Sequence, residues 1–178
     1  MSVTRRDCLA LAGLGLLSPS FALADDRWAP RRLNPSERGM MERFLRRLSL
    51  HVPEIARDAE FLGDHVRIRL GEDRLFRTGS AALSQDGVRL LTLIAEMMMI
   101  FRVRMEAVAH HHSDGQSFRS FIISERRATA VTAAMESRQV RRDLLLATGL
   151  GENFPIATNA TELGRATNRR VELIFRPA

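Results

Sequence analysis

The chain has 178 residues, enough for one ordinary domain with a short leader and too few for a second, catalytic domain. All 27 basic residues are arginine, a single cysteine is present, and the formal net charge is +6. The arginines are scattered rather than grouped in blocks, so the charge does not define a nucleic-acid-binding segment.

The first 24 residues have the pattern of an export signal. Arg5 and Arg6 precede an apolar run of about 10 residues, shorter than the roughly 20 that a membrane span needs, and small residues follow up to Ala24. The paired arginines resemble those of a twin-arginine signal. We therefore predict cleavage near Ala24, a mature chain that begins near Asp25, and a periplasmic location without a stable membrane anchor. A buried N-terminal helix is the alternative.

Cys8, the only cysteine, lies within this leader and follows charged residues rather than the small apolar residues of a lipoprotein signal. We therefore expect a mature chain with neither a disulfide nor a lipid anchor. After Ala24, 25 arginines against 20 acids leave a net charge of about +5. An exported protein with this charge meets anionic lipid and cell-wall polymer, and we expect no nucleic-acid partner.

Residues 25–63 are predicted to form a linker and an amphipathic helix. The linker, "DDRWAPRRLNP", carries two prolines and mixed charge. Asn34 and Ser36 then flank Pro35 in a helix-start pattern. Apolar residues follow at the three-and-four spacing of a helical stripe: Met40, Met41, Phe44, Leu45 and Leu48. We predict that this stripe packs on its own domain, and docking on a partner is the alternative.

From residue 64 the pattern changes to alternating strands and helices. "HVRIRL" alternates apolar residues with arginines as a half-buried strand does, and "FRVRMEAVA" shows the same period. Helical spacing marks "GSAALSQDGVRLLTLIAEMMMI" between them and the segment from Phe118 to Ser137 after them. "DLLLATGLG" and "RRVELIF" are predicted as two further strands. The order strand, helix, strand, helix, strand, strand indicates an α/β fold with a mixed sheet packed on helices.

Four motifs in this region resemble, in the same order, those of the OmpA-like peptidoglycan-binding domain family. "LFRTGSAALSQDGVRLLTLIA" resembles its opening strand and helix, and "HSDGQSFRSFIISERRA" resembles its His-Thr-Asp loop followed by Leu-Ser-x-x-Arg-Ala. "GLGENFP" resembles its Gly-x-Gly-x-x-x-Pro turn, and "ELGRATNRRVELIF" its closing Gly-Arg-x-x-Asn-Arg-Arg-Val-Glu strand. The resemblance covers about residues 65–176. It implies a two-layer α+β domain of βαβαββ order over residues 64–178.

The resemblance implies recognition rather than catalysis. Domains of this family grip the diaminopimelate-bearing stem peptide of peptidoglycan, and no bond is broken. The free end of diaminopimelate carries an ammonium and a carboxylate, so its receptor needs one acid and one arginine that converge on a small pocket. The implied function is a non-catalytic periplasmic domain, without a cofactor, that binds peptidoglycan and anchors or positions an envelope component. Envelope or outer-membrane proteins are the further partners that this role implies.

Two alignments of the second motif assign the acid differently. Counted back from Arg127 without a gap, the family's Asp falls on His112 and its Asn on Ser120. Aligned by chemistry, His112-Ser113-Asp114 stands for His-Thr-Asp. We prefer the second alignment, because it keeps histidine, hydroxyl and carboxylate together. On this alignment Asp114 binds the ammonium and Arg127 the carboxylate, while Ser113 shapes the pocket.

The closing motif adds Asn168 and Arg169 to the candidate binding residues. Arg169 and its neighbour Arg170 should face opposite sides of a strand, so ion pairing and ligand contact are equal alternatives there. Of the helix neighbours Arg126 and Arg127, only one is expected to face the loop, and Arg126 is the better candidate for an ordinary exposed helix arginine.

The histidine run allows one more interpretation. His110 and His112 lie two apart on a strand and share a face, so they could ligate a metal together with Asp114. No HExxH pattern or cysteine ligand supports this, and we predict no metal. The second functional hypothesis is a structural module of an envelope assembly that has lost peptidoglycan binding. The ungapped alignment, with His112 at the position of the acid, favours it.

Overall fold

The computed structural model describes residues 28–113 and 115–178. The predicted leader, residues 1–24, and Asp114 lie outside the described residues. Leu33–Ala178 form one compact unit.

Helix α2 (Pro35–His51) is closed at its start by a capping box. The Asn34 side chain accepts a hydrogen bond from the backbone N–H of Glu37, and the Glu37 carboxylate accepts one from the backbone N–H of Asn34, both at 2.9 Å. Met41, Phe44 and Leu48 of the apolar stripe are buried in the core of the unit, and Met40 and Leu45 pack against it. The Phe44 ring lies 5.1 Å from that of Phe175. The helix thus lies before residue 64, the predicted start of the domain, and packs into the domain's core.

Five strands form one mixed sheet in the order β1-β2-β5-β3-β4. β3 and β4 are parallel, and all other neighbours are antiparallel. The closing strand β5 therefore lies at the centre, between β2 and β3. The strands are β1 (Ala59–Phe61), β2 (Val66–Gly71), β3 (Val103–His110), β4 (Leu145–Gly151) and β5 (Arg170–Pro177). This confirms the predicted mixed sheet.

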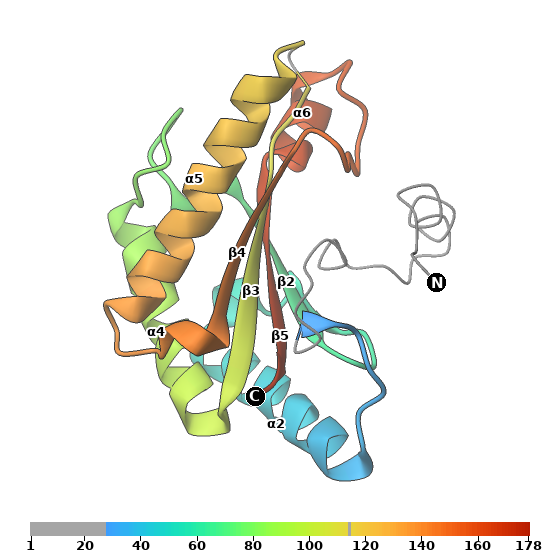
Figure 1. Ribbon diagram of the computed structural model, residues 1–178, viewed down its shortest axis with the longest axis vertical. Helices are drawn as coiled ribbons and strands as arrows, with labels where there is room; N and C mark the ends of the chain where they lie inside the picture. Colours follow the sequence, from blue (N-terminus) through green and yellow to red (C-terminus); the bar gives the residue numbers. More distant parts are fainter. Residues whose placement is uncertain (1–27, 114) are drawn as a thin grey trace, which may run out of the picture. The chain divides into compact units, whose positions relative to one another are not determined.

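Two long helices, α4 (Gln85–Phe101) and α5 (Ser117–Glu136), pack on the sheet (Figure 1). Alternate residues of the central strands belong to the core that these helices cover: Val103, Met105, Ala107, Ala109, Val171, Leu173 and Phe175. Apart from α2, the remaining helices are short: η4 (Pro53–Ile55), α3 (Glu72–Leu75), η5 (Arg142–Leu144) and α6 (Glu162–Asn168). Within the described residues, no helix has both the length and the apolar character that crossing a membrane requires.

The ends of some elements differ from the prediction. α4 begins at Gln85, because the Ser84 side chain accepts a hydrogen bond from the backbone N–H of Gly87 at 2.9 Å. The helix continues through Phe101, where the alternation predicts a strand, and Arg102 ends it in the left-handed conformation with φ of 52°. β1, α3 and α6 are missing from the predicted order, since elements this short show no period of their own.

Two glycines let α5 lie directly on β4. A Cβ atom at Gly149 would meet the backbone nitrogen of Glu125 at 2.4 Å, and one at Gly151 would meet that of Phe121 at 3.1 Å. The Glu125 carboxylate accepts a hydrogen bond from the Gly149 N–H at 2.8 Å, and the Ser124 hydroxyl accepts one from the Gly151 N–H at 2.9 Å. β4 is an edge strand, so these side chains satisfy N–H groups that could otherwise pair with another strand.

Candidate functional site

A pocket of about 510 Å³ lies where the chain after β3, helix α5 and the segment around α3 meet. Four arginines, one glutamate and two histidines supply its charged and titratable lining: Glu72, His111, His112, Arg119, Arg126, Arg127 and Arg169. Thr78, Gly79, Ile122 and Ile123 complete the lining. We call this site the arginine pocket. It brings together three of the predicted site residues: His112, Arg127 and Arg169.

Arg127 projects from the middle of α5 and is only 2% exposed. Its guanidinium forms an ion pair with Glu72, donates a hydrogen bond from Nε to the carbonyl of Ser80 at 3.2 Å, and lies 5.4 Å from the centre of the Phe76 ring. Burial lowers the pKa of Arg127, and the charge of Glu72 opposes this effect. Contacts to residues 72–80 therefore hold the Arg127 side chain in place at the pocket wall.

Glu72 links two arginines of the pocket. Besides Arg127, it pairs with Arg169, whose Nε lies 2.9 Å from Glu72 Oε1. Arg169 Nη2 also lies 2.9 Å from Glu162 Oε1, and hydrogen bonds from Arg169 and Arg165 hold the pKa of Glu162 below its ordinary value. Among the described residues that line the pocket, the single acid is thus shared by two arginines. Glu72 was not among the predicted site residues, because no periodic pattern distinguishes it within "LGEDRLF".

The two histidines after β3 stack on one another beside the arginines. The rings of His111 and His112 lie 4.4 Å apart, centre to centre. The His112 carbonyl accepts a hydrogen bond from the buried Ser120 hydroxyl at 3.4 Å, and the backbone N–H of Ser113 donates one to Asn159 Oδ1 at 3.4 Å. Ser113 and Ser120 therefore lie next to the pocket without lining it. Asp114 lies outside the described residues, and its role stays a prediction.

Arg126 and Arg127 both line the arginine pocket, and which of them faces the loop stays a prediction because Asp114 lies outside the described residues. Adjacent residues of a helix point about 100° apart, and the pocket is wide enough for both side chains to line it. Arg127 is buried, whereas Arg126 is exposed at the rim. Arg119, two turns earlier on α5, adds a further exposed guanidinium to the rim.

Asn168, like Ser113 and Ser120, does not line the pocket. Its side chain is fully buried at the end of α6. The amide oxygen accepts hydrogen bonds from the backbone N–H groups of Ile156 and Ala157 at 2.9 and 3.0 Å. The amide nitrogen donates to the Ala157 carbonyl and to Asn159 Oδ1, both at 2.8 Å. Asn168 thus holds the loop before α6.

His110 ends β3 in a buried position away from the pocket lining. Its Nε2 lies 3.9 Å from Oε1 of Glu172, which also accepts a hydrogen bond from Arg170 Nε at 2.8 Å. Burial, followed by the charge of Arg170, lowers the pKa of His110 to about 4. His110 and His112 therefore do not converge. Among the residues that the structure describes, no group of three histidine, cysteine or acidic side chains could hold a metal ion.

The composition of the arginine pocket favours carboxylate ligands. A guanidinium binds a carboxylate through two parallel hydrogen bonds, and Arg119 and Arg126 lie exposed at the rim where a ligand would enter. Arg127 and Arg169 lie deeper and share Glu72. A ligand with a carboxylate can therefore be received at the rim and compete with Glu72 at the wall of the pocket.

The chain is similar to several known proteins. The model of the OmpA family matches residues 75–169. The chain is 29% identical over 116 residues to the probable lipoprotein YiaD of Escherichia coli. The matched residues cover 65% of this chain and 53% of that protein. The chain is 32% identical over 108 residues to outer membrane protein A of Bordetella avium, with 60% and 56% covered. The chain thus spans about half the length of these two relatives.

A further relative is the peptidoglycan-binding protein ArfA of Mycobacterium tuberculosis, 31% identical over 104 residues, which cover 54% of this chain and 32% of that protein. Among solved structures, a putative MotB-like protein from Desulfovibrio vulgaris has a TM-score of 0.69 at 21% identity, with 80% of this chain and 95% of that chain covered. The cell wall anchor of the T6SS from Pseudomonas aeruginosa has a TM-score of 0.65 at 25% identity, with 78% and 97% covered. These structures confirm the predicted fold.

Proposed function

The chain belongs to the OmpA family, and on this premise we propose that it binds peptidoglycan through the arginine pocket without catalysing a reaction. Two comparisons support the proposal: one relative is named a peptidoglycan-binding protein, and one similar structure is described as a cell wall anchor. The chain covers only part of its relatives, so the proposal concerns this domain alone.

The observation that carries the proposal is the position of Arg127. This arginine belongs to the motif that resembles the family's Leu-Ser-x-x-Arg-Ala, and it lies in the wall of the arginine pocket. We propose that the ligand is the diaminopimelate end of a stem peptide. Its carboxylate binds Arg127 with help from Arg126 and Arg169, and its ammonium binds Asp114. Ser113, His112 and Ser120 shape the loop that carries this acid.

In the cell, this binding would anchor or position an envelope component. We propose that residues 1–24 direct export and are removed near Ala24, so that the domain works in the periplasm with peptidoglycan as its ligand. An envelope or outer-membrane protein is its proposed second partner.

Co-sedimentation with purified sacculi tests the proposal. The chain should pellet with diaminopimelate-type sacculi at low salt and pellet less with lysine-type sacculi, because lysine lacks the second carboxylate. Arg127→Ala and Asp114→Asn should each weaken binding by about tenfold or more, the loss expected for one charge-assisted contact of about 1.5 kcal/mol. Arg74→Ala, at an exposed arginine outside the pocket, is the matched control. Wild-type chain that stays in the supernatant at low salt would contradict the proposal.

A second candidate function has one observation in its favour. Arg127 is already bonded within the domain, to Glu72 and to the carbonyl of Ser80, and it is almost fully buried. An interaction module of an envelope assembly that has lost its ligand could keep such a closed arrangement. Tight co-purification with envelope proteins, unchanged by Arg127→Ala and combined with no binding to sacculi, would favour this module over the first proposal.

A further inference from the structure

The ends of α2 and α4 form an exposed apolar surface at the far end of the domain from the arginine pocket. β3 separates the two sites: it starts at Val103, just after α4, and ends at His110, directly before the pocket residue His111. A strand of this length spans about 26 Å. In Figure 1, α2 and the end of α4 lie at the bottom, and α5 begins at the top.

Three large apolar side chains stand out from this surface. Leu50 in the last turn of α2 is 70% exposed, and Met99 and Ile100 in the last turn of α4 are 50% and 64% exposed. Leu50 and Ile100 line one hollow of about 470 Å³ together with Phe101. Three arginines supply the rest of its lining: Arg43, Arg46 and Arg47. We call Leu50, Met99, Ile100 and these three arginines the basic apolar surface.

The arginines of this surface carry charge that is not neutralised locally. Arg43, Arg46 and Arg47 are exposed, and none of them forms an ion pair with another described residue. The acid next to them, Glu42, is paired with Arg38 at 3.4 Å. Within the part of the chain that the structure describes, no carboxylate lines the hollow. Exposed apolar side chains and unpaired guanidinium groups are thus presented together.

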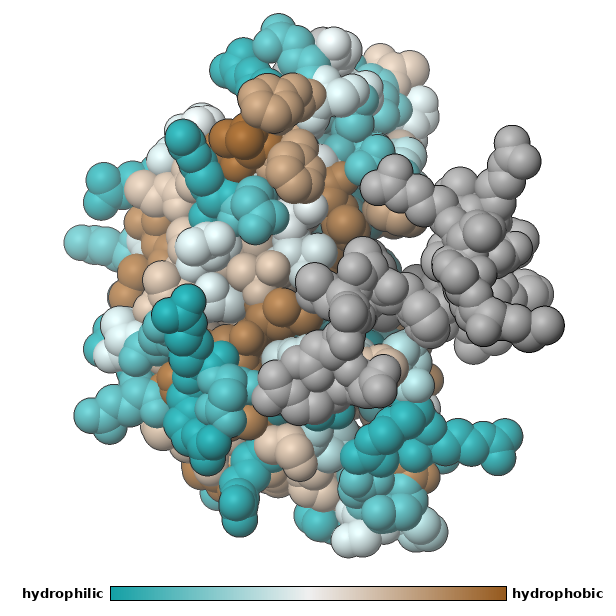
Figure 2. Space-filling model, in the orientation of Figure 1, coloured by the Kyte–Doolittle hydropathy of each residue, from teal (hydrophilic) through white to brown (hydrophobic). Residues whose placement is uncertain are grey.

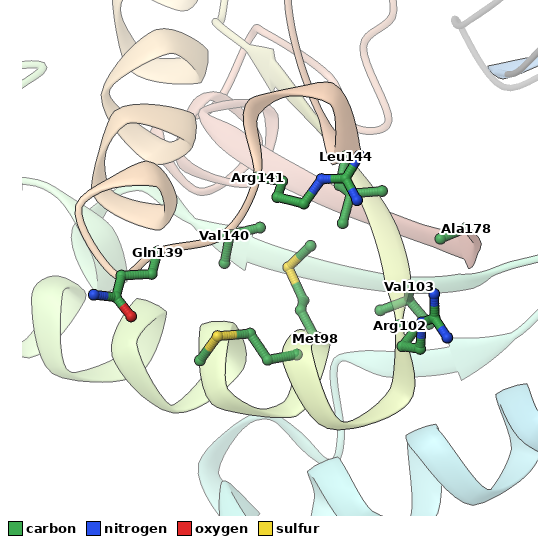
Figure 3. Close-up of a pocket in the computed structure, with 9 residues that line it drawn as sticks. Met98, Arg102, Val103, Gln139, Val140, Arg141, Leu144 and Ala178 are labelled. Atoms are coloured by element: carbon green, nitrogen blue, oxygen red, sulfur yellow. The ribbon is translucent and has the colours of Figure 1, made fainter.

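A smaller hollow of about 230 Å³ continues the same composition next to Met99 (Figure 3). Met98 from α4 and Val140 from the segment after α5 face into it, and Arg102 and Arg141 contribute to its lining. Arg141 is paired with Asp143 at 2.6 Å. The apolar and basic character therefore extends beyond the end of α4.

We propose that the basic apolar surface docks on an anionic phospholipid membrane. Leu50, Met99 and Ile100 would insert between the headgroups, and the guanidinium groups would bind lipid phosphates. Arginine suits this position, because its methylene stem packs along apolar surface while its charged end reaches phosphate. A lipid surface accepts protruding side chains without a preformed complement, whereas an acidic protein partner would have to supply recesses for all three. The net positive charge of the chain adds to its attraction to the anionic membrane.

Vesicle flotation tests this proposal independently of wall binding. The chain is purified after export, and mass spectrometry of its N-terminus checks that all variants have the same first residue. It is then mixed at low salt with phosphatidylcholine vesicles that contain or lack phosphatidylglycerol. One variant replaces the apolar pair, Leu50→Ser with Ile100→Ser. Its control replaces two apolar residues elsewhere that are at least as exposed, Phe118→Ser with Leu163→Ser.

A second pair of variants tests the charge. Three arginines of the surface become glutamine in one variant: Arg43, Arg46 and Arg47. The control has the same net charge and replaces three exposed arginines outside the surface: Arg57, Arg74 and Arg77.

The chain should float with anionic vesicles and not with neutral ones, and 0.5 M salt should release it, because salt screens the phosphate contacts. Each variant of the surface should raise the lipid concentration needed for half-binding at least tenfold relative to its control. Failure of the wild-type chain to float at low salt would overturn the proposal. Equal losses in the surface variants and their controls would also overturn it, as would equal binding to neutral vesicles.

Discussion

In the arginine pocket, the carboxylate of Glu72 pairs with the buried guanidinium of Arg127. The two residues come from α3 and α5, which are far apart in sequence, and each restricts the other. Since Arg169 shares the same carboxylate, a ligand that enters the pocket must compete with Glu72 for both arginines. This competition makes Glu72 a determinant of affinity under the proposed function.

Glu72→Gln should therefore strengthen binding to sacculi while it weakens the fold. The variant removes the competing charge, and we expect binding to improve about fivefold, equivalent to about 1 kcal/mol. It also leaves Arg127 without its charged partner, at a cost to the free energy of unfolding of about 1–3 kcal/mol. Co-sedimentation titrations and urea unfolding measure the two effects. Glu136→Gln removes the same charge at an exposed site and is the control. Weaker binding by Glu72→Gln would mean that Glu72 organises the pocket instead of competing.

Asn168→Ala should destabilise the loop before α6 without removing a ligand contact. The variant loses four hydrogen bonds to Ile156, Ala157 and Asn159 inside a buried site, and we expect the free energy of unfolding to fall by about 2–3 kcal/mol. Hydrogen exchange should increase over residues 156–159. Asn153→Ala, which breaks one exposed bond, should cost much less. A loss of sacculus binding with unchanged exchange in the loop would instead make Asn168 a direct binding residue.

His110 should make the stability of the fold depend on pH. Its pKa is about 4 in the folded chain, mainly through burial, against an ordinary value of 6.5. Between these values the unfolded chain binds more protons, so stability is complete above pH 6.5 and is lost as the pH falls towards 4. The expected loss is about 2–3 kcal/mol.

The pH effect is measured by urea unfolding of the wild-type chain and His110→Gln between pH 7 and 4.5. Burial raises the pKa of nearby Glu172, but the hydrogen bond from Arg170 and other charges bring it below its ordinary value, so Glu172 contributes mainly below this window. The variant should be less stable at pH 7 but should lose less stability on acidification. Parallel curves for the two proteins would show that His110 does not cause the dependence.

Gly149→Ala should test the close packing of α5 on β4. The new Cβ atom would lie 2.4 Å from the Glu125 backbone nitrogen, and a helix backbone cannot move away without disturbing the core. We expect a loss of about 2–3 kcal/mol in thermal or urea unfolding. Gly63→Ala is the control, since its site has φ of +93° and nothing within 4 Å, and backbone strain alone should cost about 1 kcal/mol. Equal losses would show that space at Gly149 is not limiting.

Figure 2 shows hydrophilic side chains spread widely over the face in view, with apolar groups between them. On a surface mixed in this way, a candidate site is identified by the residues that line one hollow together. The arginine pocket and the basic apolar surface are both identified in this way.

The sequence determined the main elements of this protein because burial imposes a period on them. Alternation marks β2 and β3, and three-and-four spacing marks α2 and α5, since each element turns one side to the core. The short elements β1, α3 and α6 escaped this reasoning. Their positions depend on what they contact, such as the pairing of β1 with β2, and not on a period of their own.

The sequence also supplied Arg127, His112 and Arg169, but only the tertiary structure decided how they meet. Glu72 lies 55 positions before Arg127 in the chain, and nothing in its local sequence marks it as a pocket residue. Asn168, chosen from a motif, serves the loop instead of the pocket lining. A motif fixes residue type and spacing along one element, whereas ion pairs and pockets form between elements whose approach depends on the packing of the whole core.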